Sequence, residues 1–195
     1  MKKQYWIGML AVAALAFGVG QTMAQDGGED KAVAAPAMPP WYAKSKEHAD
    51  LAQSVGEFDV VTEFWVAPDA PPQKAPATAT RKVIMNGYYV EETFRLPMGA
   101  GVFEGRATLG YDVVRKQYVQ TWIDNSISTL STSYGTVKDG VITFIADDID
   151  RNTGKIVKTK TVIKVENENK WVNSMFNVTE KGDVPTMRLT YTRKK

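Results

Sequence analysis

Residues 78–96, TATRKVIMNGYYVEETFRL, decide the class of fold. They place two short segments rich in β-branched and aromatic residues on either side of Asn86-Gly87. An Asn-Gly pair adopts the positive φ angles of a tight hairpin turn at little cost. The stretch therefore predicts two antiparallel strands, 78–85 and 88–96, joined by this turn.

The same texture continues on both sides of this hairpin. Short alternating segments recur about every ten positions and are separated by turn residues, which is typical of an antiparallel sheet. Asp139-Gly140 predicts a second tight turn, and residues 152–154 and 181–183 suit slightly longer ones. The ten predicted strands cover 57–66, 78–85, 88–96, 103–113, 117–124, 128–136, 141–147, 155–165, 171–178 and 186–193.

Consecutive short strands with hairpin links favour an all-β, antiparallel up-and-down meander. Such a meander closes into a barrel because closure removes the exposed strand edges. A two-sheet sandwich is the structural alternative. The choice bears on function, since a barrel of about eight to ten strands has room for one small ligand, whereas the core of a sandwich is filled.

Residues 1–24 have the parts of a secretory signal peptide. Lys2 and Lys3 precede an apolar run over 7–19, and small residues lead to an expected cleavage site after Ala24. The run is shorter than the roughly 20 residues that cross a membrane. We expect a bacterial protein that is exported to the periplasm or secreted, with no transmembrane segment after processing. An uncleaved membrane anchor is the alternative.

The residues that follow divide into a spacer and one domain. Residues 25–40 are rich in Ala, Gly, Pro and acidic residues and are predicted to be disordered, which leaves 41–195 as a single β-barrel domain. One short helix is predicted at its start, with Ser45 as the N-cap and Gly56 at the end, and it is expected to act as a lid or plug. His48 occupies a polar position of this helix, where we expect it to be exposed.

Composition excludes several classes of function. The 24 basic and 22 acidic residues nearly balance, so the chain has no electrostatic excess that would hold a nucleic acid. Cysteine is absent and His48 is the one histidine. Disulfides, thiolate metal sites and most triad chemistry are thereby removed. We expect no metal and no cofactor, and the oligomeric state is left open.

The strand predicted over 117–124 carries most of the candidate binding residues. Alternate side chains from Tyr118 to Asp124 share one face of a strand, and the intervening ones share the other. If the first set points inward, it forms an aromatic wall with an amide and a carboxylate, suited to a small hydrophobic or amphipathic ligand. If it points outward, Trp122 merely packs on the outside. With one position from each of two further strands, the candidate ligand-binding residues are Tyr118, Gln120, Trp122, Asp124, Tyr111 and Glu92.

Two other functions remain open. A hydrolase or isomerase would use Asp124 or Glu92 as an acid or base, although we assign no catalytic residue. A structural or interaction module of the cell envelope would have a filled barrel and an outer face for a partner. The loops 67–72 and 97–101 follow the first and third predicted strands and should border one opening of the barrel.

The domain resembles a bacterial family catalogued only as domain of unknown function 1579. The resemblance runs from Gly56-Glu57-Phe58-Asp59-Val60 to Thr190-Tyr191-Thr192-Arg193. Its most specific stretch is Phe103-Glu104-Gly105, Gly110-Tyr111-Asp112, Tyr118 and Trp122-Ile123-Asp124. The resemblance implies no reaction, substrate or cofactor.

The family is in turn similar to calycin or lipocalin-like barrels. In those barrels a glycine, a spacer and a tryptophan open the first strand, and a basic residue of the last strand packs over that ring. Here Gly56 and Phe58 stand at the corresponding positions, and Arg188 or Arg193 would supply the cation. The resemblance implies that these residues close one end of the barrel and are structural.

Overall fold

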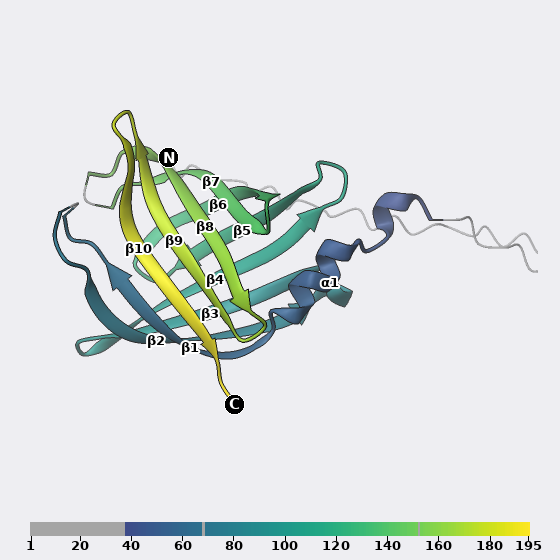
Figure 1. The fold of residues 1–195 in the computed structure, drawn as a ribbon, viewed down its shortest axis with the longest axis horizontal. Coiled ribbons are helices and arrows are strands. Elements are labelled where there is room, and N and C mark those ends of the chain that lie inside the picture. Colours follow the sequence, from purple (N-terminus) through teal and green to yellow (C-terminus); the bar gives the residue numbers. More distant parts are fainter. Residues whose placement is uncertain (1–37, 68, 152) are drawn as a thin grey trace, which may run out of the picture. The chain divides into compact units, whose positions relative to one another are not determined.

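Ten antiparallel strands follow one another around a closed barrel in chain order, and β1 pairs with β10 to complete it (Figure 1). The predicted meander is confirmed and the sandwich alternative is wrong. The strands are β1 (Gly56–Phe64), β2 (Gln73–Ile84), β3 (Tyr89–Met98), β4 (Gly101–Asp112), β5 (Gln117–Asp124), β6 (Ile127–Lys138), β7 (Val141–Ile149), β8 (Ile156–Asn167), β9 (Lys170–Thr179) and β10 (Gly182–Arg193).

The computed structural model describes residues 38–67, 69–151 and 153–195. The predicted signal peptide and most of the predicted spacer lie outside the described residues. The helical elements are η1 (Pro40–Tyr42), α1 (Lys46–Gln53) and η2 (Met85–Gly87). In these described parts of the chain, no helix combines the length and the apolar character needed to span a membrane.

Positive φ angles occur at the two tight turns that the sequence predicts. Asp139 and Gly140 have φ angles of 52° and 76° and form a two-residue link between β6 and β7. Asn86 and Gly87 have φ angles of 56° and 88°. The second link is longer than predicted, because η2 adds Met85 to the turn and β3 begins only at Tyr89.

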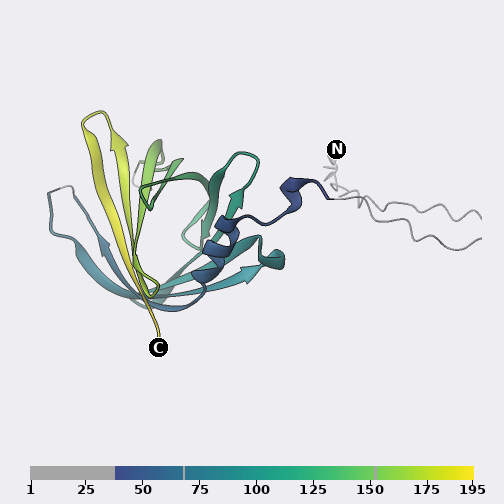
Figure 2. The ribbon, with the colours of Figure 1, turned by 45° about the vertical axis from the view of Figure 1, so that its right-hand side comes forward.

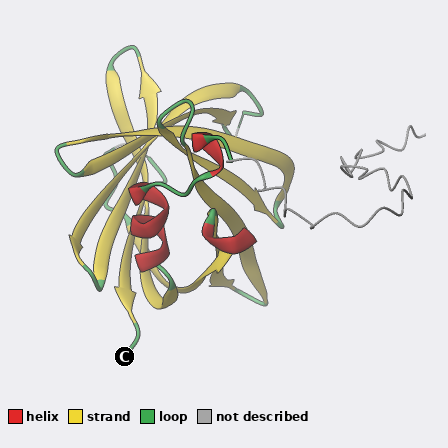
Figure 3. Cartoon of the chain, turned by 90° about the vertical axis from the view of Figure 1, so that its right-hand side faces the viewer, coloured by secondary structure: helices red, strands yellow, loops and turns green. Residues whose placement is uncertain are grey.

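The two ends of the barrel differ. One, which we call the helix end, carries α1 beside β3, β4 and η2, and Figure 3 shows α1 in front of this end. The other, which we call the mouth, is formed by the β1–β2, β3–β4, β5–β6, β7–β8 and β9–β10 connections. Figure 2 shows the β1–β2 and β9–β10 connections on the side away from α1. The predicted grouping of loops 67–72 and 97–101 at one opening follows from this topology.

Inward-facing side chains fill the barrel at the helix end. The ring of Phe58 is fully buried and lies 4.6 Å from Trp171 and 6.3 Å from Tyr191, measured between centroids. The guanidinium of Arg193 lies 4.9 Å from the Phe58 centroid and donates to the carbonyl of Gln53, which ties the end of α1 to the last strand. Of the two arginines that the calycin resemblance suggested, Arg193 is therefore the one over the ring. Arg188 instead packs on Trp65.

His48 is buried, with 5% of its surface exposed, and the prediction that it is exposed is wrong. The periodicity of α1 placed it on a polar face, but η2 and the end of β4 cover that face. Its ring meets Tyr88 and Tyr111 edge to face at centroid distances of 5.6 and 6.1 Å. Its Nδ1 accepts a hydrogen bond from the backbone N–H of Ser45, the N-cap of α1, at 3.0 Å. The histidine thus holds the start of the helix against the barrel.

We expect this contact to make the stability depend on pH. Burial lowers the pKa of His48 below its ordinary value of 6.5, so at mildly acidic pH the unfolded chain binds a proton that the folded chain does not. The stabilisation is complete above the unfolded-state pKa of 6.5 and is lost as the pH falls from there toward the lower folded-state value. The free energy of unfolding should therefore fall over this pH range.

Urea denaturation between about pH 5 and pH 8 measures this effect. His48→Gln is the control, because a glutamine at this position completes a capping box without titrating near neutrality. The same loss of stability in His48→Gln and in the unchanged chain would contradict the assignment to His48.

Candidate ligand-binding site

The strand β5 turns the predicted face inward. Its ladder with β4 pairs Trp122 with Ala107 and Tyr118 with Tyr111, and both Ala107 and Tyr118 are buried. The intervening residue Ile123 is exposed. The open question of which face of β5 points inward is thereby answered: Tyr118, Gln120, Trp122 and Asp124 line the interior.

Trp122 is fixed as part of the inner wall near the mouth. Gly105 lies on the neighbouring strand β4, and a Cβ at that position would overlap the six-membered ring of Trp122. The indole therefore lies flat against the backbone of β4, which only a glycine permits. Phe103 stacks on the indole at a centroid distance of 6.5 Å, and Phe94 lies tilted at 6.4 Å. These three rings form one apolar, aromatic surface inside the barrel.

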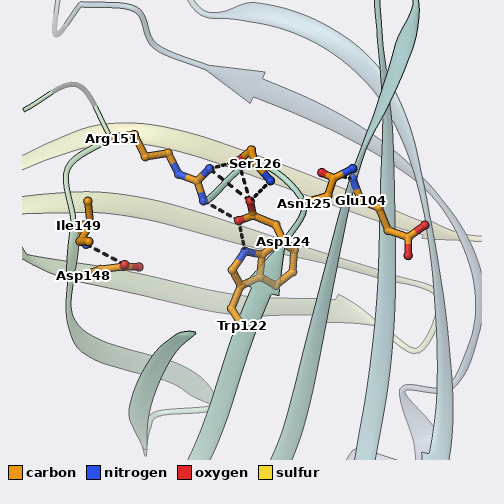
Figure 4. Close-up of polar contacts among 8 residues, drawn as sticks. All are labelled: Glu104, Trp122, Asp124, Asn125, Ser126, Asp148, Ile149 and Arg151. Carbon is orange, nitrogen blue, oxygen red and sulfur yellow. Dashed lines mark hydrogen bonds and ion pairs between the residues drawn. The ribbon is translucent and has the colours of Figure 1, made fainter. Parts of the chain in front are cut away.

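Asp124 holds the edge of this surface in place, as Figure 4 shows. Its Oδ2 accepts from Trp122 Nε1 at 3.0 Å and pairs with Arg151 at 2.5 Å, while its Oδ1 accepts from the Ser126 hydroxyl at 2.6 Å and from the Ser126 N–H at 2.9 Å. The side chain is 1% exposed. Burial alone would raise the pKa of this carboxyl, but the hydrogen bonds from Arg151, Ser126 and Trp122 together outweigh burial and hold it well below its usual range.

Arg151 bridges a seam in the wall of the barrel. Among the described residues, the β6–β7 ladder runs from Tyr134–Ile145 to Lys138–Val141, so residues 127–133 of β6 have no partners on β7. Arg151 reaches from the β7–β8 connection to Asp124 at the end of β5 (Figure 4). This ion pair therefore joins the two sides of the seam at the mouth.

The inward-facing side chains of the mouth half are less buried than those of the helix end. At the helix end, inward-facing residues such as Phe58 and Tyr191 are almost completely buried. In the mouth half, where β6 and β7 leave the seam between them, the residues on the same inward faces are only half-buried. By the alternation of the strands, these side chains point into the barrel. The half-buried inward residues include Phe64, Leu96, Phe103, Gln120, Trp122, Ser131, Ser133, Asp148, Val157, Thr159, Thr161, Met175, Asn177 and Met187.

The two tyrosines among the candidate residues lie toward the helix end of the barrel. Tyr111 and Tyr118 contact each other at 5.1 Å between centroids and lie near α1 at the helix end. Burial first, and then the carboxylates of Asp50 and Glu47, raise the pKa of Tyr118 to about 12, so it stays a neutral phenol. The structure therefore brings Trp122 and Asp124 into contact and places the two tyrosines at the helix end, with Gln120 between Trp122 and Tyr118 on the same face of β5.

Glu92 belongs to a buried cluster at the helix end. Its Oε2 pairs with Nε of Arg81 at 2.5 Å and its Oε1 accepts from the Tyr191 hydroxyl at 3.0 Å. The Arg81 guanidinium lies over Trp171, 4.8 Å from the ring centroid. Arg81 is not among the predicted site residues, although it faces Glu92 across the Asn86-Gly87 hairpin. Arg151 is not among them either, because the β7–β8 connection has no pattern that indicates a partner on β5.

Two hollows lie outside the barrel interior. One of about 450 Å³ covers the outer face of β4 and β5 beside the mouth, next to Val102, Arg106 and Ile123. The other, of about 290 Å³, lies between Trp41 and Tyr89 near the start of α1. Among the described residues, no group of three or more His, Asp or Glu side chains is arranged to hold a metal ion.

Comparison with solved structures finds the same fold at low sequence identity. The S-type phycobiliprotein lyase from Guillardia theta matches with a TM-score of 0.54 and 12% identity, over 78% of this chain and 94% of that one. A redesigned β-barrel matches with a TM-score of 0.38 and 10% identity, over 74% of this chain and 96% of that one. At such identities the likeness to the lyase shows the fold alone.

Comparison by sequence identifies the family. No curated protein matches the chain. Residues 43–193 match the family described as "Protein of unknown function (DUF1579)", which covers the barrel from just before α1 to the end of β10. The chain therefore belongs to the DUF1579 family of proteins of unknown function.

Proposed function

We propose that the protein is a non-catalytic binding barrel that holds one small hydrophobic or amphipathic molecule in its mouth half. The observation that carries this proposal is the difference between the two halves of the interior. The helix end is filled by buried rings, whereas the inward side chains of the mouth half keep accessible surface inside a wall whose seam between β6 and β7 is bridged by the Arg151–Asp124 ion pair. Preformed concave sites with an apolar wall and a few polar groups are typical of small-molecule binding.

The composition of the wall supports an amphipathic ligand. The aromatic surface of Phe94, Phe103 and Trp122 offers apolar contact, and Gln120 lies next to Trp122 on the same face of β5. Because Gly105 and Asp124 fix the indole from two sides, the surface is organised before a ligand binds. Preorganisation of this kind reduces the entropy that binding costs.

The carboxylates of the enzymatic alternative are bound to fixed partners. Asp124 has a pKa well below its usual range, which makes it a poor acid or base near neutral pH. Glu92 is committed to Arg81 and Tyr191 away from the mouth. An interaction module with a filled barrel agrees less well with the accessible interior.

Export is part of the proposal and rests on the N-terminal residues. Lys2 and Lys3, the apolar run over 7–19 and Ala24 support a cleaved signal peptide. The binding barrel would then act in the periplasm or outside the cell. N-terminal sequencing of protein recovered after export tests cleavage after Ala24.

Titration of tryptophan fluorescence tests binding. The panel contains fatty acids, isoprenoids and small aromatics, and the name of the similar solved barrel, a phycobiliprotein lyase, is a reason to add pigment-like conjugated molecules. We expect at least one class to change the emission saturably and to release heat in calorimetry. Trp122→Phe should weaken the calorimetric affinity about tenfold, in line with loss of aromatic contact and of the indole hydrogen bond.

Trp41→Phe is the matched control, because Trp41 is exposed and lies near the start of α1. It should bind as the unchanged chain does. The proposal would be wrong if no class of compound gave a saturable response and if Trp122→Phe and Trp41→Phe gave the same calorimetric traces.

A further inference from the structure

Three buried polar atoms lie on the inward faces of β1 and β9 without a hydrogen-bond partner among the described residues. They are Thr62 Oγ1, Asn173 Oδ1 and Trp171 Nε1. The exposed fractions of these residues are 1%, 7% and 5%. A buried polar atom without a partner costs about 1–3 kcal/mol, so such atoms in a native fold call for an explanation.

The register brings two of these atoms to one level of the barrel. Thr62 pairs with Leu189, and Leu189 pairs with Asn173, so the two polar side chains flank one leucine on adjacent strands. Trp171 lies one layer closer to the helix end, beside Tyr191. We call Thr62, Asn173 and Trp171 the polar floor, since they lie where the filled half of the barrel meets the accessible half.

Flexible side chains cover the polar floor from the mouth side. The next inward layer pairs Phe64 with Met187, and Met187 with Met175. Both methionines are only half-buried. Unbranched methionine side chains rearrange easily around different shapes, so a molecule that enters from the mouth can displace them and reach the atoms below.

The chemistry of the polar floor selects the end group of such a molecule. Asn173 Oδ1 only accepts hydrogen bonds, Trp171 Nε1 only donates, and the Thr62 hydroxyl does both. The nearest buried charges, Arg81 and Glu92, are paired with each other. A charged end group at this depth would lose its hydration without gaining a counter-ion, whereas a hydroxyl or a primary amide matches both kinds of partner.

We infer that the ligand is an apolar or aromatic molecule with an uncharged hydroxyl or amide at one end, and that it binds with this end on the polar floor. Its body then lies along the aromatic surface of Phe94, Phe103 and Trp122 toward the mouth. The inference rests on the proposed function and makes it specific. Thr62 and Asn173 are the specificity-determining residues.

A series of probes with one skeleton and different end groups tests the inference. Farnesol, farnesene, farnesoic acid and farnesylamine share a skeleton, and 2-naphthylmethanol, 2-methylnaphthalene and 2-naphthoic acid form a second, aromatic series. The affinities are measured by calorimetry with the full processed chain. The alcohol should bind about threefold to tenfold more tightly than the hydrocarbon or the charged members, because this is the usual effect of one or two net hydrogen bonds.

Thr62→Val separates the proposed role from a structural one, because valine keeps the shape and removes the hydroxyl. It should lower the affinity for the alcohol about threefold to tenfold, leave the affinity for the hydrocarbon unchanged, and leave the free protein at least as stable as before, since an unpaired polar group is removed. Thr190→Val is the control, because Thr190 lies on the opposite face of the barrel wall, next in sequence to the inward Leu189. Asn173→Leu repeats the test at the second acceptor.

The possible outcomes separate a failure of this inference from a failure of the proposed function. Equal affinity for alcohol and hydrocarbon, or stronger binding of the acid, would overturn the inference while leaving a binding barrel. If Thr62→Val lowered the affinity for every probe equally, the threonine would contribute only to the shape of the barrel wall. That result would also overturn the inference. If no member of either series binds, the proposed function fails and the inference fails with it.

Discussion

Arg81→Met is expected to destabilise the fold by about 3–5 kcal/mol, the usual cost of leaving one partner of a buried ion pair alone. Arg81 and Glu92 have side-chain exposures of 7% and 5% and are joined by a bond of 2.5 Å. Without the guanidinium, the Glu92 carboxylate keeps only the Tyr191 hydroxyl as a partner. Domains of this kind are stable by about 5–15 kcal/mol in total, so the variant should be close to unfolding at ambient temperature.

The surroundings of the pair explain why nothing else replaces the lost charge. The Arg81 guanidinium lies between Glu92 and the stacked rings of Trp171 and Tyr191, at 4.8 and 5.6 Å from their centroids. Burial, followed by the negative charge of Glu92, raises the pKa of Tyr191 well above 10, so its hydroxyl remains a donor. Glu92 has its hydrogen-bond partners in Arg81 and Tyr191, and a methionine at position 81 supplies no replacement for the first.

A graded set of variants tests this account. Arg81→Met with Glu92→Leu removes both charges and should recover most of the lost stability, because an apolar pair of similar volume often equals a buried ion pair. Tyr191→Phe removes one hydrogen bond and should cost about 1 kcal/mol. Guanidinium denaturation of the three variants measures the series. If the double variant were no more stable than Arg81→Met, the loss would come from packing rather than from an unpaired charge.

The same cluster shows what the sequence could predict. The predicted turn at Asn86-Gly87 fixes the register of the hairpin, and that register sets Arg81 opposite Glu92. The sequence therefore contains the information for this ion pair, although the prediction assigns Glu92 to ligand binding. The number and order of the strands were predictable for the same local reason, since turns and alternation act within a few residues, although β2 begins five residues and β10 four residues before the predicted starts.

The rest depends on contacts between distant segments. The burial of His48 arises from the packing of α1 against η2 and β4, which helix periodicity does not contain. The direction in which β5 faces follows from closure of the whole sheet. Arg151 reaches Asp124 across 27 positions of the chain, from a connection without regular structure. Such pairings are set by tertiary packing rather than by local sequence pattern.

Gly105→Ala is expected to damage both the fold and the site. The added Cβ would overlap the Trp122 ring, and strain of this kind costs typically about 1–3 kcal/mol. The indole would have to leave the wall and give up its hydrogen bond to Asp124 and its stacking on Phe103. Ligand affinity should therefore fall along with stability, and the near-ultraviolet circular dichroism of the tryptophans should weaken.

Gly101→Ala is the matched control for this variant. Gly101 belongs to the same strand, β4, and the nearest atom to an added Cβ is the carbonyl oxygen of Met98 at 3.9 Å. Neither glycine has a positive φ angle, so both substitutions leave the backbone unstrained and differ only in what the new methyl group meets. Gly101→Ala should change the free energy of unfolding by less than about 0.5 kcal/mol.

A second substitution tests whether the overlap with the indole causes the loss of stability in Gly105→Ala. Trp122→Leu added to Gly105→Ala removes the ring that the methyl group meets, so the double variant should be more stable than the sum of the two single changes predicts. Ligand affinity should not return with stability, because the aromatic surface is gone. If the losses of stability in the two single variants simply added in the double variant, Gly105 would be needed for the backbone of β4 and not for the ring. The wall would then not be preorganised by this contact. A positive coupling, with affinity still lost, would tie the binding surface to this one contact between a glycine and a tryptophan.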